Sequence, residues 1–270
     1  YELEVLGQYY GKYTTTVLKN NIILNEYGSN SQTVLLNNNA EVPQILSGRI
    51  PYSFAVNEKD EHIAVFYNRN DHNDNALLIL DQENQVQAQL DGLGQNEQIY
   101  SARFFDNTAY LVTFREVDPV YAIDISDITS PRLLSELKIP GFSNYLHAMD
   151  EKFLVGIGKT GGSWWSRQGE ISLFDTSDLG FVRKIDSLYL PDYDDGHVST
   201  HQNILKYENH LIYKSYNYTY IIKLDGTRLK LKELIYGRDD NSDFLIHDNQ
   251  LLMITKGSTR IIPLEADIVE

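Results

Sequence analysis

A short apolar strand that ends in an acidic or amide residue recurs along the chain, and this repeat constrains the fold more than any other feature. The copies end at Asn37, Asp81, Asp124, Asp175, Asp225 and Glu265. Successive copies are 40 to 51 residues apart, which is close to the period of a four-stranded propeller blade. The spacing therefore predicts a series of equivalent sheets.

Each copy has similar neighbours in the sequence. Two apolar or alternating runs precede it, and a tight turn such as Asp106-Asn107 or Asp248-Asn249 joins them. Asn and Asp suit such turns because they tolerate left-handed backbone and bond their own chain. A weaker strand follows each of the first five copies, as at 132–139 and 228–235. The pattern predicts four antiparallel strands in each repeat.

The acidic residue at the end of each apolar strand has a predicted structural role. Its carboxylate can accept hydrogen bonds from the backbone of the turn that follows. We expect this at Asp81, Asp124, Asp175 and Asp225.

The sixth copy has no fourth strand after it, whereas residues 3–10 (LEVLGQYY) are a strand without a repeat of their own. We expect this run to pair in the last repeat and close a ring, because closure removes two free sheet edges. The expected fold is all-β, a six-bladed β-propeller of four-stranded antiparallel blades in a single domain, 1–270. Its expected blades are 12–50, 51–94, 95–141, 142–196, 197–237, and 238–270 with 1–11.

Composition narrows the class of protein. The chain has 270 residues, 42% of them hydrophobic, which is enough for a packed core. Its net charge of −15 disfavours nucleic acid and anionic membranes as partners. It has no cysteine, which excludes disulfides and thiolate metal sites. No run approaches the ~18 apolar residues of a membrane span. The opening residues lack Met and a signal-like core, so we expect a mature product or an excised domain, monomeric on its own.

One part of the chain is similar to a known family. The segments IYSARF (99–104), YLVTFREVDPVYAIDISD (110–127), SPRLLSELKIPGFSNYLH (130–147) and ISLFDTSD (171–178) carry the similarity. They resemble secreted bacterial and archaeal proteins with a C-terminal β-propeller domain, distantly related to WD repeats. Ala148 stands where the family has proline, and the family's further N-terminal half is not in this sequence. The resemblance implies a propeller and a location outside the cell or on its surface, but it implies no catalytic residues.

Polar residues near the expected first strand of several blades form the leading candidate site. In a propeller this strand lines the central axis, and ligands bind at the mouth of the channel. The candidate residues are Tyr100, Arg103, Tyr145, His147 and His201. Such a group can bind an anion or a sugar. The alternative is that these side chains hydrogen-bond one another or channel water, as buried polar groups must.

Two loops carry further candidates. Asp192, Asp194 and Asp195 precede a glycine, as hard oxygen ligands do at the start of a calcium loop. The full calcium motif is absent because its twelfth position holds Asn203, and a solvated turn is the alternative. A second polar loop is expected at 68–75. His197 and His201 are too far apart for one zinc ion, because four residues of strand span about 13 Å.

The adjacent Trp164 and Trp165 lie in the expected loop 159–169. They can stack on sugar rings or anchor a protein partner. Alternatively, one ring packs onto the blade and the other covers a neighbouring loop.

The functional expectation follows from these features. We expect a non-catalytic interaction or adhesion module, extracellular or on the cell surface, that binds a protein or glycan through rim loops. Calcium is the one cofactor for which the sequence offers candidate ligands. A hydrolase or lyase acting on polysaccharides at the channel mouth stays open, and it requires Arg103, His147 and His201 to converge. A structural spacer in a larger secreted protein also stays open.

Overall fold

The structure is a computed structural model of the chain. It describes residues 13–26, 32–51, 55–59, 61–70, 72–114, 118–139, 141–160, 168–191, 203–215, 217–236, 243–255 and 258–264. This part is built from β-strands, with a short 3-10 helix at Leu179–Phe181. Within these ranges no helix has the length and apolar character needed to cross a membrane.

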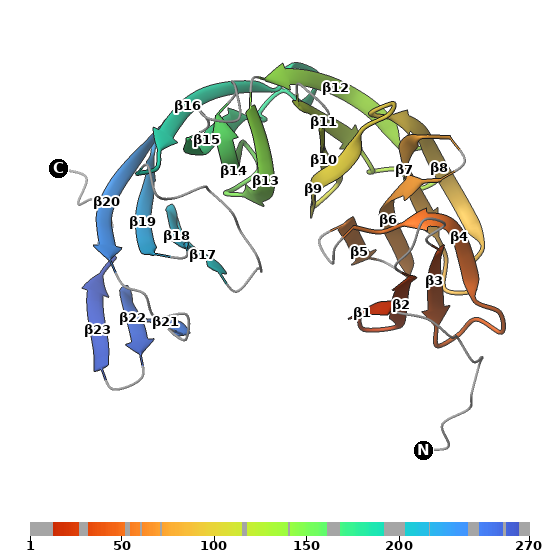
Figure 1. Ribbon diagram of the computed structural model, residues 1–270, viewed down its shortest axis with the longest axis horizontal. Helices are drawn as coiled ribbons and strands as arrows, with labels where there is room; N and C mark the ends of the chain where they lie inside the picture. The colour runs from red at the N-terminus through yellow and green to blue at the C-terminus, as the bar shows by residue number, and fades with distance from the viewer. Residues whose placement is uncertain are drawn as a thin grey trace. The chain divides into compact units, whose positions relative to one another are not determined.

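The strands form antiparallel sheets in which the order in space follows the order in sequence (Figure 1). The first sheet has eight strands. They are β1 (Tyr13–Val17), β2 (Asn21–Glu26), β3 (Gln32–Asn37), β4 (Gln44–Arg49), β5 (Val56–Lys59), β6 (His62–Arg69), β7 (Asp74–Leu80) and β8 (Val86–Leu93).

Three sheets of four strands and one of three follow in the described residues. The first four-stranded sheet contains β9 (Gln98–Phe105), β10 (Thr108–Phe114), β11 (Asp118–Asp124) and β12 (Arg132–Ile139). The second contains β13 (Gly141–Ala148), β14 (Phe153–Thr160), β15 (Gly169–Asp175) and β16 (Arg183–Tyr189). The third contains β17 (Ile204–Tyr207), β18 (His210–Lys214), β19 (Tyr218–Asp225) and β20 (Arg228–Tyr236). The last sheet contains β21 (Asp243–His247), β22 (Gln250–Thr255) and β23 (Ser258–Pro263).

The predicted repeat of four-stranded antiparallel sheets is confirmed. The strand expected at 132–139 is β12, and the one expected at 228–235 is β20. Left-handed backbone occurs in the predicted turns, at Asp106, Asp248 and Asn249. These turns form because the residues can adopt positive φ at low steric cost.

The eight-stranded sheet consists of two four-strand sets joined at one point. β4 pairs with β6 only through Gly48 with Arg69 and Arg49 with Asn68. A Cβ atom at Gly48 would lie 2.0 Å from the carbonyl oxygen of Asn68. The two sets can therefore meet here only because position 48 has no side chain.

Burial within a set explains why the sheets must stack. β7 is buried along its whole length, whereas most residues of β8 are exposed. A strand buried on both faces needs apolar partners on each side of its sheet. Phe66 of β6 meets this need by stacking on Phe104 of β9, with ring centroids 5.2 Å apart.

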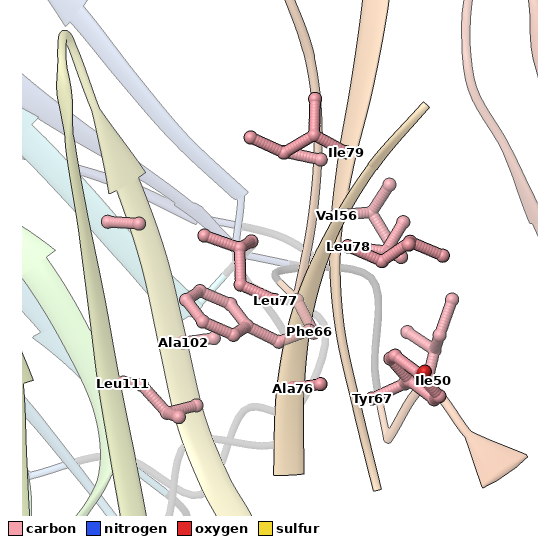
Figure 2. Close-up of a cluster of buried hydrophobic side chains, with 14 of the residues drawn as sticks. Ile50, Val56, Phe66, Tyr67, Ala76, Leu77, Leu78, Ile79, Ala102 and Leu111 are labelled. Carbon is pink, nitrogen blue, oxygen red and sulfur yellow. The ribbon is translucent and has the colours of Figure 1, made fainter. Parts of the chain in front are cut away.

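The chain divides into two compact units, one of residues 1–148 with 177–182 and one of 149–176 with 183–270. In the core of the first unit, Phe66 points toward Ala102 and Leu111, while Tyr67 lies on the other side of its strand beside Ile50 (Figure 2). Side chains thus leave β6 toward both faces, as the two-sided burial requires. The second unit has its own apolar cluster over β18 to β23.

The acidic residue that ends the third strand of a set caps the following turn, as predicted, at Asp81 and Asp124. Asp81 Oδ1 accepts from the backbone N–H groups of Glu83 at 2.9 Å and Gln85 at 2.8 Å. Asp124 Oδ1 accepts from the N–H of Ser126 at 2.9 Å. Three of these carboxylates also bind basic side chains of the fourth strand: Asp124 binds Arg132, Asp175 binds Arg183 and Asp225 binds Lys230. These carboxylates tie each turn to its own sheet.

Side chains at the end of a first strand also hold the hairpin turn of a neighbouring set. The Glu58 carboxylate accepts from the N–H groups of Lys19 and Asn20 at 2.9 and 3.1 Å. Lys59 donates to the carbonyl of Asp106 at 3.2 Å and the Asn107 side chain at 3.1 Å. In the second unit, the Tyr207 hydroxyl donates to Asn249 Oδ1 at 2.6 Å. These contacts fix adjacent sheets against each other within each unit.

The expectation of a loop over 68–75 is wrong at both ends of the segment. β6 continues to Arg69 and β7 begins at Asp74, so the connection is short. Arg69 binds Asp74 through two hydrogen bonds of 2.7 and 2.6 Å, and Asn68 bonds the Asn75 side chain. The polar sequence reads as a loop, but pairing of these side chains across the hairpin stabilises the strands.

Removal of the Asp124 carboxylate tests the turn cap. Hydrogen bonds from Ser126, followed by the one from Arg132, lower the pKa of Asp124 to about 2. A folded-state pKa below the unfolded value of about 3.9 stabilises the fold at higher pH, and this stabilisation is lost as pH falls through about 2. We expect Asp124→Ala to unfold about 1 kcal/mol more easily at pH 7 and to lose less stability between pH 5 and pH 2, measured by urea titration. The exposed Glu83→Ala is the control, and an unchanged pH dependence in Asp124→Ala would contradict the cap.

A second prediction concerns the junction at Gly48. Gly48→Ala should lower the free energy of unfolding by roughly 2 to 4 kcal/mol, because the new Cβ forces β4 away from β6. Gly92→Ala is a matched control, since Gly92 also has positive φ but its Cβ would meet nothing within 4 Å. The control should cost only about 1 kcal/mol. Urea unfolding that ranks the two variants equally would refute the steric argument.

Candidate functional site

Four of the predicted site residues lie in the described part of the chain, on the first strands of two consecutive sheets. Tyr100 and Arg103 are on β9, and Tyr145 and His147 are on β13. The other candidates lie outside the described residues. They are His201, Trp164, Trp165, Asp192, Asp194 and Asp195.

β9 and β13 lie side by side in the first unit, although they belong to different sheets. Each is an edge strand of its own sheet, so its outer backbone edge is not occupied by its own sheet. The side chains of the two strands can therefore meet around a common point.

Tyr145 and His147 form the centre of this group. They are two residues apart on one strand, so both side chains point to the same face. The Tyr145 hydroxyl lies 3.1 Å from His147 Nδ1, within hydrogen-bond distance. The rings are nearly parallel, at 22°, with centroids 6.1 Å apart. Tyr145 is 4% exposed, whereas His147 is partly exposed, so a buried tyrosine holds a partly exposed imidazole.

Arg103 reaches the same region from β9. Burial raises the pKa of the Tyr145 hydroxyl, and the positive charge of Arg103 acts in the opposite direction with a smaller effect. The neighbouring positions of β9 and β13 agree with this influence. Because burial raises the pKa of Tyr145 above its ordinary value of about 10, its hydroxyl stays protonated at neutral pH. We call Arg103, Tyr145 and His147, which lie on these two neighbouring strands, the inner-strand cluster. The convergence of Arg103, His147 and His201 that catalysis requires stays a prediction, because His201 lies outside the described residues.

Tyr100 lies at an irregularity in β9. Arg103, Ala102 and Ser101 pair in turn with β10, but the next pair is Ile99 with Thr113, so the ladder skips Tyr100. A bulge changes the direction in which a side chain points and often occurs beside a functional site. Tyr100 is half-buried. The bulge frees its side chain from the regular alternation between the two faces of β9, three residues before Arg103 of the inner-strand cluster.

The polar residues at the β6–β7 hairpin form a structural network. Arg69 also binds Asp91 at 2.9 Å, and the backbone N–H of Gly92 donates to Asp74 at 3.0 Å. The hydrogen bond from Arg69 is the main cause of the lowered pKa of Asp74. Asn75 is buried, and its amide donates to the carbonyl of Leu93 at 2.8 Å. With these oxygens engaged by the protein, the network binds the hairpin to β8.

No group of three or more acidic or histidine side chains with metal-binding geometry occurs in the ranges that the structure describes. The predicted calcium ligands Asp192, Asp194 and Asp195 lie outside those ranges.

Two basic residues in the second unit escaped the sequence analysis. His210 on β18 and Lys223 on β19 are 2% and 1% exposed. The register of the sheet places them directly opposite each other. The sequence does hint at the burial of Lys223, because this lysine lies within the apolar run of 220–224, which is typical of a strand buried on both faces.

Comparison with known proteins places the chain in a family. Residues 36–207, which are more than half of the sequence, match the family described as a β-propeller domain. An uncharacterised protein of Archaeoglobus fulgidus is 34% identical over 174 residues, 64% of this chain and 27% of the relative. An uncharacterised protein of Methanocaldococcus jannaschii is 32% identical over 196 residues, 69% of this chain and 30% of the relative. The chain thus spans less than a third of each archaeal relative.

Solved structures support the fold alone. The computationally designed protein Ika8 aligns with 93% of this chain and 70% of its own, with a TM-score of 0.55 and 14% identity. BamB from Moraxella catarrhalis aligns with 89% of this chain and 68% of its own, with a TM-score of 0.56 and 11% identity. The stacked four-stranded sheets and the family match agree: the chain belongs to the β-propeller domain family.

Proposed function

We propose that the domain is a closed six-bladed propeller whose last blade is completed by residues 3–10. The last sheet has three strands in the described residues, where the preceding sets have four. The run at 3–10 is similar in sequence to the fourth strands, such as β12. An added strand would pair with the outer edge of β23, which otherwise stays open to association.

Deletion of residues 1–11 tests closure. An unpaired β23 leaves alternate backbone N–H groups open to water. We expect these amides, within residues 258–262, to lose at least tenfold of their protection in hydrogen exchange, while amides of β6 and β7 keep theirs. Equal protection of β23 in the full and shortened chains would contradict closure by this segment.

We propose that the domain is a non-catalytic interaction module located outside the cell or on its surface, and that it binds an acidic glycan. The observation that carries this function is the inner-strand cluster, in which Arg103 and His147 are partly exposed around the buried hydroxyl of Tyr145. The extracellular location and a distant relation to WD repeats rest on the sequence resemblance of 99–178.

The chemistry of the cluster favours a ligand with carboxylate and hydroxyl groups. A guanidinium matches a carboxylate with two parallel hydrogen bonds. Imidazole and phenol groups bond sugar hydroxyls, and the nearby Tyr100 ring can stack on a sugar face. Trp164 and Trp165, and calcium at Asp192, Asp194 and Asp195, are proposed additional contacts at the rim. A protein partner with an acidic surface would present the same carboxylate.

Binding is favoured over catalysis by the state of Tyr145. A general base works best when its pKa is near the working pH. Burial moves the pKa of Tyr145 upward, away from neutrality. A positioning role for this hydroxyl, which orients His147, agrees better with that shift than proton abstraction from a sugar.

Binding of polygalacturonate, measured by calorimetry at physiological salt, tests the proposal. The Debye length there is about 8 Å, so repulsion from the net charge of −15 is largely screened. Arg103→Gln should weaken binding at least tenfold, because a charge-assisted hydrogen-bond pair is lost. Tyr145→Phe should weaken it about threefold by releasing His147.

Arg132→Gln is the matched control, since this arginine is 67% exposed at the side chain and lies on the outer strand β12. The control should bind as the unaltered protein does. Binding that is insensitive to Arg103→Gln would remove the inner-strand cluster from the function. Growth of ultraviolet absorbance from an unsaturated sugar product would assign a lyase activity in place of simple binding.

A further inference from the structure

One segment of the second unit fits the acceptor motif for N-linked glycans. The motif is Asn, any residue except proline, and then Ser or Thr. The chain contains it once, as Asn217-Tyr218-Thr219. A match of three residues is common by chance, so the place of the segment in the fold has to decide whether an oligosaccharide fits there.

Asn217 lies at the tip of a hairpin. β18 ends at Lys214 and β19 begins at Tyr218. The backbone N–H of Ser215 donates to the carbonyl of Tyr218 at 2.8 Å, and the N–H of Tyr218 donates to Ser215 Oγ at 3.1 Å. Only two residues separate these partners, and Asn217 is the second of them. Asn217 is partly exposed and takes no part in the strand pairing, so a branch at this position interrupts no ladder.

An exposed aromatic ring lies at the same end of the sheet. Tyr236, the last residue of β20, pairs with Tyr218 and is 71% exposed. The two rings meet edge to face, with centroids 5.5 Å apart. Neighbouring strands are about 5 Å apart, so a sugar on Asn217, next to Tyr218, can reach the ring of Tyr236. The apolar face of the sugar can pack on this ring and cover it.

The threonine of the motif is buried in the folded protein. Thr219 is 3% exposed and pairs with Lys214 on one side and Ile235 on the other. A transferase that recognises the threonine hydroxyl cannot reach it inside this sheet. Attachment must therefore precede the assembly of β18, β19 and β20, while the segment is still extended.

We propose that Asn217 is the acceptor of an N-linked oligosaccharide that is added before the sheet folds. The step joins Asn217 Nδ2 to the anomeric carbon of a sugar carried on a lipid phosphate. The bond from that carbon to the phosphate oxygen breaks, the phosphate leaves with the electron pair, and a base of the transferase takes the amide proton. The proposal rests on the extracellular location proposed above, because this transfer accompanies export. It is independent of the inner-strand cluster, which shares no residue with the motif.

Export of the whole chain behind a cleavable signal sequence in a eukaryotic host tests the site. The mass of the secreted protein should exceed that of the polypeptide by an oligosaccharide, which peptide-N-glycosidase removes. Asn217→Gln should abolish the added mass, because the chain holds no second acceptor motif. Secreted protein without the added mass would overturn the proposal. Since the signal is supplied, that result would leave the proposed location and the glycan-binding function as they stand.

Gln98→Thr is the matched control. It creates an acceptor motif at Asn96, which is exposed in the turn before β9. This variant should carry two glycans, because both positions lie in turns. A glycan on Asn96 without one on Asn217 would show that the chain met the transferase, and it would contradict the site.

The order of events is tested with purified oligosaccharyltransferase and a lipid-linked oligosaccharide. Folded chain made without the glycan should be modified at least tenfold more slowly than a peptide of residues 212–222, because only the peptide exposes the threonine. Equal rates would contradict addition before folding.

The contact with the aromatic ring is tested by melting temperature. Glycosylated protein should melt at a higher temperature than the same protein after treatment with peptide-N-glycosidase. Tyr236→Ser should remove most of that difference, because the sugar then has no ring to cover. An equal difference in the variant would contradict the contact.

Discussion

The structure depends on the burial of the middle strands of each sheet on both faces. β7 and β15 expose almost no side chain, and a sheet with such strands is insoluble by itself. Each sheet must therefore stack on a neighbour, and the stacking of Phe66 on Phe104 is one local form of this requirement. The outer strands carry the polar residues, since they alone face water along their length. This constraint explains the repeat in the sequence, because each copy contains an apolar strand that must be buried on both faces.

Polar contacts then fix how the stacked sheets meet. Glu58, Lys59 and Tyr207 each leave the end of a first strand and bond the hairpin turn of the adjacent set. Apolar packing is tolerant of small sliding, whereas a hydrogen bond to one turn specifies a position. The inner-strand cluster depends on this precision, because Arg103 and Tyr145 come from different sheets and share no backbone pairing.

Local pattern sufficed to predict the strands and turns. The bounds of β12 and β20 were predicted to within one residue, because polar and apolar residues alternate in a strand that faces water on one side. Positive φ at Asp106 and Asp248 follows from residue type alone. Features that depend on a neighbour in space were missed: the Arg69–Asp74 pair that extends a hairpin, the Gly48 junction, and the bulges at Tyr100 and Lys232. Gly48 meets a strand that is distant in sequence, and the bulges skip the regular register. Arg69 and Asp74 are close in sequence, but their pairing across the hairpin is hidden by the polar composition of the segment. The placement of Arg103 and His147 on the first strands of consecutive sets was predictable because equivalent strands of a repeat align, but the burial of Lys223 required the packed sheet.

Native-state hydrogen exchange of the full chain tests most directly whether sheet stacking is the basis of the fold. Two-sided burial predicts that amides of β6 and β7 and those of β10 and β11 exchange last, and that they open with one shared free energy, because neither sheet is stable without the other. As denaturant is added, the opening free energies of the amides in both sheets should converge on that common value together. Separate opening of the two sheets, with one retaining full protection after the other has exchanged, would contradict the dependence of each on its neighbour.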